Sequence, residues 1–150
     1  MSKKSIAFLI LLIILPVIIY FLWPSDEARI KKLFREGAKA VEARKAEDVM
    51  SKVSFNYSDE HGLSYITLKQ AVERTLKEMS GIQVEYDIKG ITIKDKNASA
   101  ELDLRVIATY GKDTGYVVGD AARPAHLTFS LEKERTNWQI TKVEGLKVEF

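Results

Sequence analysis

The chain has 150 residues, of which 23 are lysine or arginine and 21 are aspartate or glutamate, and none is cysteine. This length is enough for one domain with a substantial core. The lack of cysteine excludes disulfides, a thiolate nucleophile, cysteine-based zinc sites and a lipidated amino-terminal cysteine.

The first predicted element is an apolar helix. Residues 6–23, IAFLILLIILPVIIYFLW, form a run of 18 residues without a charge. Such a helix spans about 27 Å, close to the roughly 30 Å hydrocarbon core of a bilayer. The alternative is a cleavable signal peptide, but its apolar region is usually about 7–15 residues long and a small-x-small site follows it. Bulky residues follow here, so we predict a transmembrane anchor over residues 1–24 and one domain over residues 25–150.

The flanking charges predict how this helix is oriented. Lys3, Lys4 and the terminal amine favour a cytoplasmic amino terminus. Five basic residues also follow the helix within about 15 residues, but long domains are translocated largely regardless of charge. We therefore expect a single-pass protein of a bacterial-type inner membrane, with its carboxy-terminal domain in the periplasm.

The predicted domain carries no net charge. Without Lys3 and Lys4, 21 basic residues remain against 21 acidic residues. A nucleic-acid binder needs a basic surface that engages phosphates, so we predict no nucleic-acid partner.

Helical spacing dominates the first half of the domain. Behind Ser25, which can cap a helix, apolar residues recur at helical intervals from Ile30 to Val41. A short second helix fits residues 46–53, and a third fits residues 65–79.

Alternation of apolar and polar residues dominates the second half. Four alternating segments begin at Ile82, Ala98, Ala125 and Trp138. The phase shifts after Gly90, which predicts a bulge, and the last segment continues towards Leu146, Val148 and Phe150. Alternation with a period of two predicts a sheet with one buried and one wet face. The expected fold class is therefore α+β, with three helices packed on a curved, antiparallel four-stranded sheet.

This order of elements resembles the nuclear transport factor 2-like superfamily, also called the cystatin-like cone fold. The motifs that carry the resemblance are Tyr57-x-Asp59-x-x-Gly62 after the short helix and Trp138-x-Ile140 in the last strand. The resemblance covers about residues 26–150 and implies a sheet curled around the first helix, with a pocket in the cone. The superfamily includes ketosteroid isomerase-like enzymes, ligand binders and non-catalytic modules, among them membrane-anchored periplasmic scaffold subunits of type IV secretion systems.

The stretch NYSDEHG, residues 56–62, contains the candidate catalytic residue. The resemblance implies that Asp59 takes the place of the general base of the isomerase-like enzymes. Those enzymes also stabilise an oxyanion with a tyrosine on the first helix and a protonated aspartate on the sheet. The corresponding places fall near residues that have no such donor: Gly37 or Ala38, and Ala125 or Leu127. Without these donors, Asp59 would lack electrostatic stabilisation of the oxyanion, which is often the largest catalytic effect. We therefore interpret the stretch as a polar turn.

The two histidines do not suggest a metal site. His61 lies close to Asp59, but zinc needs three or four ligands, and His126 falls on the predicted wet face of the sheet. The Gly-Lys pair at residues 111–112 lacks the preceding glycine and the following helix of a phosphate loop. We therefore predict neither a metal nor a cofactor.

The predicted inward face of the sheet is apolar or aromatic throughout. A buried carboxylate needs a partner or a shifted pKa, and this face supplies no partner. We expect side chains to fill most of the cone, with at most a small apolar pocket near Tyr57 and Asp59. The candidate ligand-contacting residues are Phe34, Tyr57, Asp59, Tyr86, Leu104 and Phe129.

A glycine-rich segment, YGKDTGYVVGDAARP at residues 110–124, is predicted to be a long connection between two strands. Long loops tend to be functional. Tyr116, Val117 and Val118 are therefore candidates for a binding loop.

Two classes of function follow. The first is a membrane-anchored, non-enzymatic binding or scaffolding module. The second is a carrier of a small apolar ligand, or a ketosteroid isomerase-like enzyme with Asp59 as its base. Candidate partners are the lipid bilayer, another protein, a second copy of the chain and a small apolar ligand. A deep cavity with Asp59 buried near a second donor would favour the enzyme, and a filled cone would favour the module.

Overall fold

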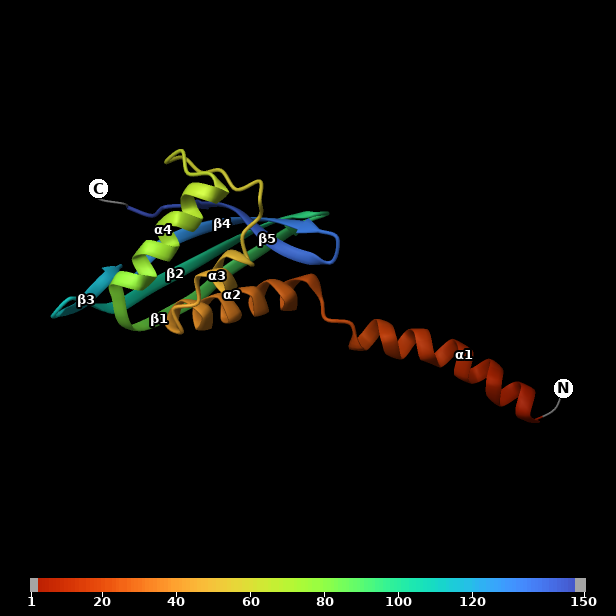
Figure 1. The fold of residues 1–150 in the computed structure, drawn as a ribbon. Coiled ribbons are helices and arrows are strands. Elements are labelled where there is room, and N and C mark those ends of the chain that lie inside the picture. Colours follow the sequence, from red (N-terminus) through yellow and green to blue (C-terminus); the bar gives the residue numbers. More distant parts are fainter. Residues whose placement is uncertain (1–2, 148–150) are drawn as a thin grey trace.

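The structure is a computed structural model that describes residues 3–147 (Figure 1). In this part of the chain the helices are α1 (Lys3–Leu22), α2 (Asp26–Glu42), α3 (Ala46–Met50) and α4 (Tyr65–Glu78). The strands are β1 (Met79–Lys94), β2 (Asn97–Tyr110), β3 (Asp113–Val118), β4 (Ala125–Glu134) and β5 (Asn137–Glu144).

All strand pairs are antiparallel, in the order β1-β2-β4-β5, and β3 pairs with β2 beside this path. The predicted bulge is present, because the register of β1 and β2 shifts between Ile88 and Gly90. The sheet has one strand more than expected. The extra strand is β3, which forms a hairpin with β2 inside the segment predicted to be a loop, and Gly111 makes its turn with a φ of 64°.

The last strand is shorter than predicted. It ends at Glu144, and Gly145 follows with a φ of 93°. An added Cβ at Gly145 would lie 2.5 Å from the carbonyl oxygen of His126, so the backbone passes too close there for a side chain. Of the residues expected to extend the strand, Val148 and Phe150 lie outside the described residues.

The short helix α3 also ends early, at Met50 rather than residue 53. Beyond it the chain pairs with β5, because the Ile140 amide donates to the Lys52 carbonyl at 2.8 Å and the Ser54 amide donates to the Ile140 carbonyl at 2.9 Å. Val53 and Ile140 form an isolated parallel bridge. The chain thus leaves the helix to add its backbone to the edge of the sheet.

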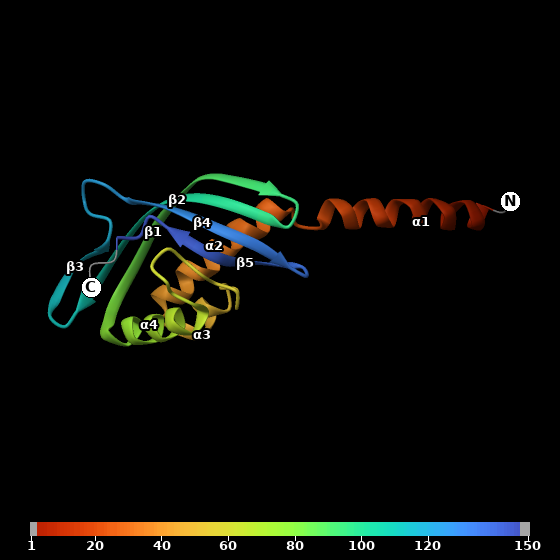
Figure 2. The same ribbon diagram turned by 90° about the horizontal axis from the view of Figure 1, so that it is seen from above.

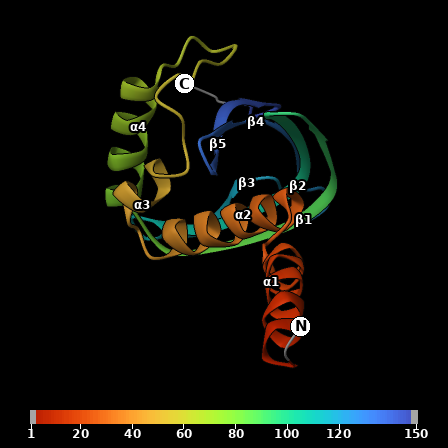
Figure 3. The same ribbon diagram turned by 90° about the vertical axis from the view of Figure 1, so that its right-hand side faces the viewer.

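The sheet curls around α2. Figure 3 shows an arc of strands with α2 inside it and with α3 and α4 across the open side. The core begins where Ile30, Leu33 and Phe34 of α2 meet the inner face of the sheet, and the Phe34 and Phe129 rings meet edge to face at 5.0 Å. The expected α+β fold, with helices on a curved antiparallel sheet, is confirmed.

Helix α1 stands apart from this core. It projects from the end of the domain in Figures 1 and 2, and none of its residues is buried. Within residues 3–147 it is the one helix long and apolar enough to cross a membrane. Only Trp23, Pro24 and Ser25 separate it from α2. The Arg29 guanidinium lies 5.5 Å from the centre of the Trp23 ring across this junction.

Candidate functional site

An apolar cavity of about 190 Å³ lies between α2, the end of α3 and the inner face of the sheet. Its lining residues are Leu33, Phe34, Gly37, Ala38, Val41, Val49, Lys52, Val53, Val84, Tyr86, Leu102, Leu104, Val106, Phe129 and Ile140. Lys52 carries the one charge on this lining, and Tyr86 the one hydroxyl. The sheet supplies its part because alternate residues of each strand point to the same face.

Four of the six expected ligand-contacting residues line this cavity, namely Phe34, Tyr86, Leu104 and Phe129. The other two, Tyr57 and Asp59, are not among the lining residues. Tyr57 is 5% exposed and packs in a separate cluster with Met50 and Val53. The expected position of the pocket is therefore corrected: it lies against α2, and Val53 and Ile140 stand between it and Tyr57.

Asp59 holds the loop between α3 and α4 together. One of its carboxylate oxygens accepts from the Tyr57 hydroxyl at 2.8 Å, and the other accepts from the backbone amides of His61 at 2.9 Å and Leu63 at 3.0 Å. Gly62, with a φ of 75°, allows the tight turn between these amides. This arrangement matches the polar turn that we expected from the residue types.

The same contacts determine the protonation states of Asp59 and Tyr57. Burial would raise the pKa of Asp59, but the hydrogen bonds from Tyr57, Leu63 and His61 outweigh it and hold the pKa below its ordinary value of 3.8. Burial and then the hydrogen bond to Asp59 raise the pKa of the Tyr57 hydroxyl above its ordinary value. Asp59 is therefore an ionised acceptor and Tyr57 a protonated donor at neutral pH, which is a structural arrangement.

The positions at which isomerase-like enzymes have their two oxyanion-stabilising side chains hold no side-chain hydrogen-bond donor here. Gly37 and Ala38 line the cavity, and Leu127 is fully buried without lining it. Asp59 also lies outside the cavity, so the expected base and the expected places of the oxyanion donors do not come together there.

The two histidines contact different parts of the structure. His61 Nε2 lies 3.2 Å from the Leu146 carbonyl, and His126 Nδ1 lies 2.8 Å from Asp103 on the outer face of the sheet. Within residues 3–147, no group of three histidine, aspartate or glutamate side chains is arranged to hold a metal ion.

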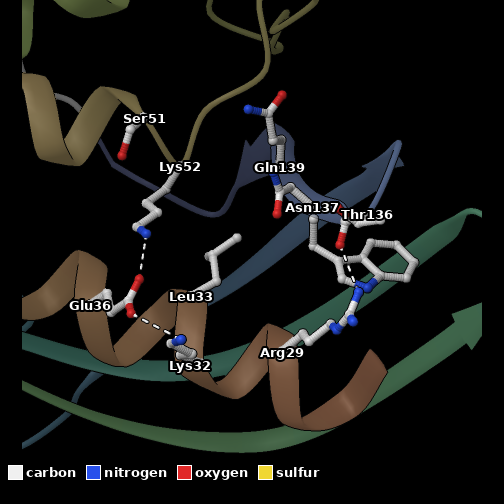
Figure 4. A pocket seen from close by; sticks show the side chains of 10 residues that line it. Arg29, Lys32, Leu33, Glu36, Ser51, Lys52, Thr136, Asn137 and Gln139 are labelled. Atoms are coloured by element: carbon white, nitrogen blue, oxygen red, sulfur yellow. Dashed lines mark hydrogen bonds and ion pairs between the residues drawn. The ribbon is translucent and has the colours of Figure 1, made fainter. Parts of the chain in front are cut away.

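A second hollow, of about 290 Å³, adjoins the cavity and is polar (Figure 4). It lies between α2, the end of α3 and the start of β5. Its lining residues are Arg29, Lys32, Leu33, Glu36, Ser51, Lys52, Thr136, Asn137, Trp138 and Gln139. Leu33 and Lys52 line both hollows.

The charges in this polar pocket form a short network. Lys52 Nζ lies 2.5 Å from Glu36 Oε2, and Lys32 Nζ lies 3.7 Å from Glu36 Oε1. The Lys52 hydrogen bond is the main reason that the pKa of Glu36 lies below its ordinary value of 4.5. Arg29 donates to the Thr136 carbonyl at 2.8 Å. The sequence did not point to Lys52, because the helical spacing of apolar residues continues to Val53 and does not show that α3 ends at Met50.

The expected binding-loop residues lie on β3. Tyr116 is 43% exposed and Val117 is 42% exposed, whereas Val118 packs against the cluster of Leu76 and Val106. They belong to the hairpin of β2 and β3 and not to a loop.

Comparison with known proteins identifies the fold. No protein-family model and no curated protein matches this chain. A domain with a cystatin-like fold from Nostoc punctiforme PCC 73102 superposes with a TM-score of 0.62 at 16% identity, covering 79% of this chain and 74% of that one. An NTF-2 like protein from Shewanella oneidensis MR-1 superposes with a TM-score of 0.59 at 19% identity, covering 79% and 97%. A candidate scytalone dehydratase from Novosphingobium aromaticivorans superposes with a TM-score of 0.64 at 12% identity, covering 81% and 87%.

These likenesses define the class of structure. The domain has the nuclear transport factor 2-like, or cystatin-like, cone fold, as the sequence motifs predicted. At these identities the likeness concerns the fold and not the activity.

Proposed function

We propose that this protein is a single-pass, membrane-anchored, non-enzymatic binding module with a nuclear transport factor 2-like domain. The observation that carries the proposal is α1, a helix of 20 residues that carries no charge after its first two lysines and has no buried residue. Such a length spans about 30 Å, the thickness of a hydrocarbon core. Pro16 fits this role, since membrane helices tolerate proline.

The junction supports an anchor that holds the domain close to the bilayer. Trp23 directly follows α1, at a position where aromatic rings favour the membrane interface. Arg29 stacks on this ring, so α2 begins within reach of the headgroups. With Lys3 and Lys4 at the other end, we propose a cytoplasmic amino terminus and a periplasmic domain in a bacterial-type inner membrane.

The cone supports binding rather than catalysis. Its lining has one ammonium and one hydroxyl and no carboxylate. The carboxylate that matches the base of isomerase-like enzymes, Asp59, is engaged by three donors in a different cluster. An enzyme built on Asp59 would need this loop to open and the carboxylate to lose its donors.

The second candidate function is a carrier of a small apolar ligand, and the cavity itself favours it. Apolar cavities of about 150 Å³ in other proteins stay dry and bind benzene. A cavity of about 190 Å³ has room for a molecule of similar size. Membrane anchoring and ligand binding are compatible, so the two candidates can describe one protein.

Cell fractionation tests the anchor. We expect the protein to stay with the membranes after high-salt and alkaline washes and to retain its amino-terminal segment. An alkaline phosphatase fusion after the last residue should be active, since this reporter folds only outside the cytoplasm. A pair of variants places one arginine either in α1 or on the surface of the domain: Leu12→Arg in the middle of α1, and Ile66→Arg at a residue that is 66% exposed on α4. Only the first should release folded protein from the membrane. A soluble form that starts near Asp26 would contradict the proposal.

A further inference from the structure

The apolar cavity and the polar pocket meet at two shared residues. Leu33 and Lys52 line both hollows, Leu33 with an apolar side chain and Lys52 with an ammonium group on an apolar stem. Figure 4 shows Lys52 reaching down towards Glu36 on α2, beside Leu33. A molecule that occupies both hollows needs an apolar part for one and a polar part for the other.

The polar pocket has an excess of positive charge. Three basic residues, Arg29, Lys32 and Lys52, line it together with one carboxylate, Glu36. Lys52 is bound to Glu36 at 2.5 Å, but an ammonium group has three donors, so two remain for another acceptor. Lys32 lies 3.7 Å from the same carboxylate, which is too far for a hydrogen bond of ordinary length. An anion between Lys32 and Lys52 would therefore meet donors that Glu36 does not use.

The size of the cavity limits the apolar part. Because about 150 Å³ is enough for a benzene ring, about 190 Å³ holds one ring or a chain of about six to eight carbons. Leu102, Leu104 and Phe129 are among the residues that line it on the sheet side. A longer chain would have to leave the cone.

We propose that the cone binds an amphiphilic anion, with its ring or short chain in the apolar cavity and its acidic head in the polar pocket at Lys52 and Lys32. This inference rests on the proposed function of the cone as a ligand-binding site, and it names the class of ligand. Glu36 then sets the affinity, because it holds Lys52 in position for the head and repels the negative charge of the head at the same time.

The experiment uses the full chain in nanodiscs of phosphatidylcholine, with ¹³C-labelled leucine and valine methyl groups. The probes are octanoate and 1-octanol at pH 7.5, where a carboxyl group is ionised, with free concentrations fixed by dialysis. We expect both probes to shift the methyl signals of Leu33, Val84 and Leu104. Octanoate should bind about tenfold more tightly than 1-octanol, as expected for one charge-assisted hydrogen bond.

Three variants locate the head. Lys52→Met keeps an apolar stem and should weaken octanoate about tenfold without changing 1-octanol. Glu36→Gln removes the repulsion but keeps a side-chain oxygen that can accept from Lys52, so it should tighten octanoate severalfold. Lys69→Met is the matched control, because Lys69 lies on α4 outside both hollows and pairs with Glu73. It should change neither affinity.

The outcomes separate this inference from the proposal on which it rests. If both probes bind but octanoate has no advantage, or Lys52→Met and Glu36→Gln leave that advantage unchanged, the anionic head is overturned and the apolar ligand site stands. If neither probe moves the cavity methyl signals, the inference and the ligand-carrier function both fall. The membrane anchor is tested by fractionation and is unaffected by either result.

Discussion

The cone cavity and the loop that contains Asp59 lie on opposite sides of one thin wall. Val53 and Ile140, joined by a parallel bridge, line the cavity and also pack in the cluster that contains Tyr57. On one side of this wall a hollow of about 190 Å³ remains open. On the other side Tyr57, Asp59 and the backbone satisfy one another in a closed network.

This difference shows that a motif at the expected place in a fold does not by itself put its carboxylate in the cavity. A carboxylate at the place of a general base is useful only if it faces the bound molecule with lone pairs to spare. Here the carboxylate stabilises a turn, and the bound molecule would meet an ammonium group instead. Substitutions can alter the wall, the network and the open space separately.

Removing the wall should have the largest effect. Ile140→Ala should lower the free energy of unfolding by about 2–3 kcal/mol, the lower part of the range for isoleucine, because the side chain is only partly buried. Urea titration of the full chain in mild detergent, followed by near-UV circular dichroism, measures this. Ile66→Ala is the control, since Ile66 is 66% exposed, and it should cost under about 0.5 kcal/mol. Equal losses in the two variants would show that Ile140 does not support a wall.

Breaking the network should have an intermediate effect that depends on pH. Asp59→Ala leaves the buried Tyr57 hydroxyl and two amides without their acceptor and should cost about 1–3 kcal/mol at pH 7. Asp59→Asn keeps one acceptor oxygen and should cost less.

The sign of the pH dependence follows from the lowered pKa of Asp59. The unfolded carboxyl titrates near pH 3.9, so its stabilising effect is fully present above about pH 5 and is lost as the pH falls through the folded pKa. The difference in stability between the wild type and Asp59→Asn should therefore shrink below about pH 4. Asp113→Asn, at an exposed carboxylate on β3, is the control substitution. A constant difference for Asp59→Asn down to pH 2 would mean that its charge does not matter.

Much of the fold could be predicted because it depends on local patterns. Ile30, Leu33 and Phe34 form a stripe at helical spacing, and this stripe is what the sheet packs against. Strict alternation likewise predicted that Tyr86, Leu104 and Phe129 point inward. Strand β3 was missed because five of its six residues are exposed, so it has no buried face to produce an alternating pattern.

The site was harder to predict because it depends on contacts between distant residues. The end of α3 is set by pairing with Ile140, far along the chain, and this pairing turns Lys52 towards Glu36. The motif pointed to Asp59 from its place in the sequence alone, and nothing local shows on which side of the wall its side chain lies.

Filling part of the open space should have the smallest effect and the opposite sign. Gly37 lies within α2, and an added Cβ would have no heavy atom within 4 Å. Gly37→Ala should therefore stabilise the domain by about 0.5–1 kcal/mol, because alanine loses less backbone entropy in a helix, and its methyl group would reduce the cavity. The urea midpoint measures the gain. Gly145→Ala should do the reverse, since its φ is 93° and its Cβ would press on the His126 carbonyl. A loss of stability in Gly37→Ala would show that the cavity closes in solution and that α2 packs against the sheet without the space on which ligand binding depends.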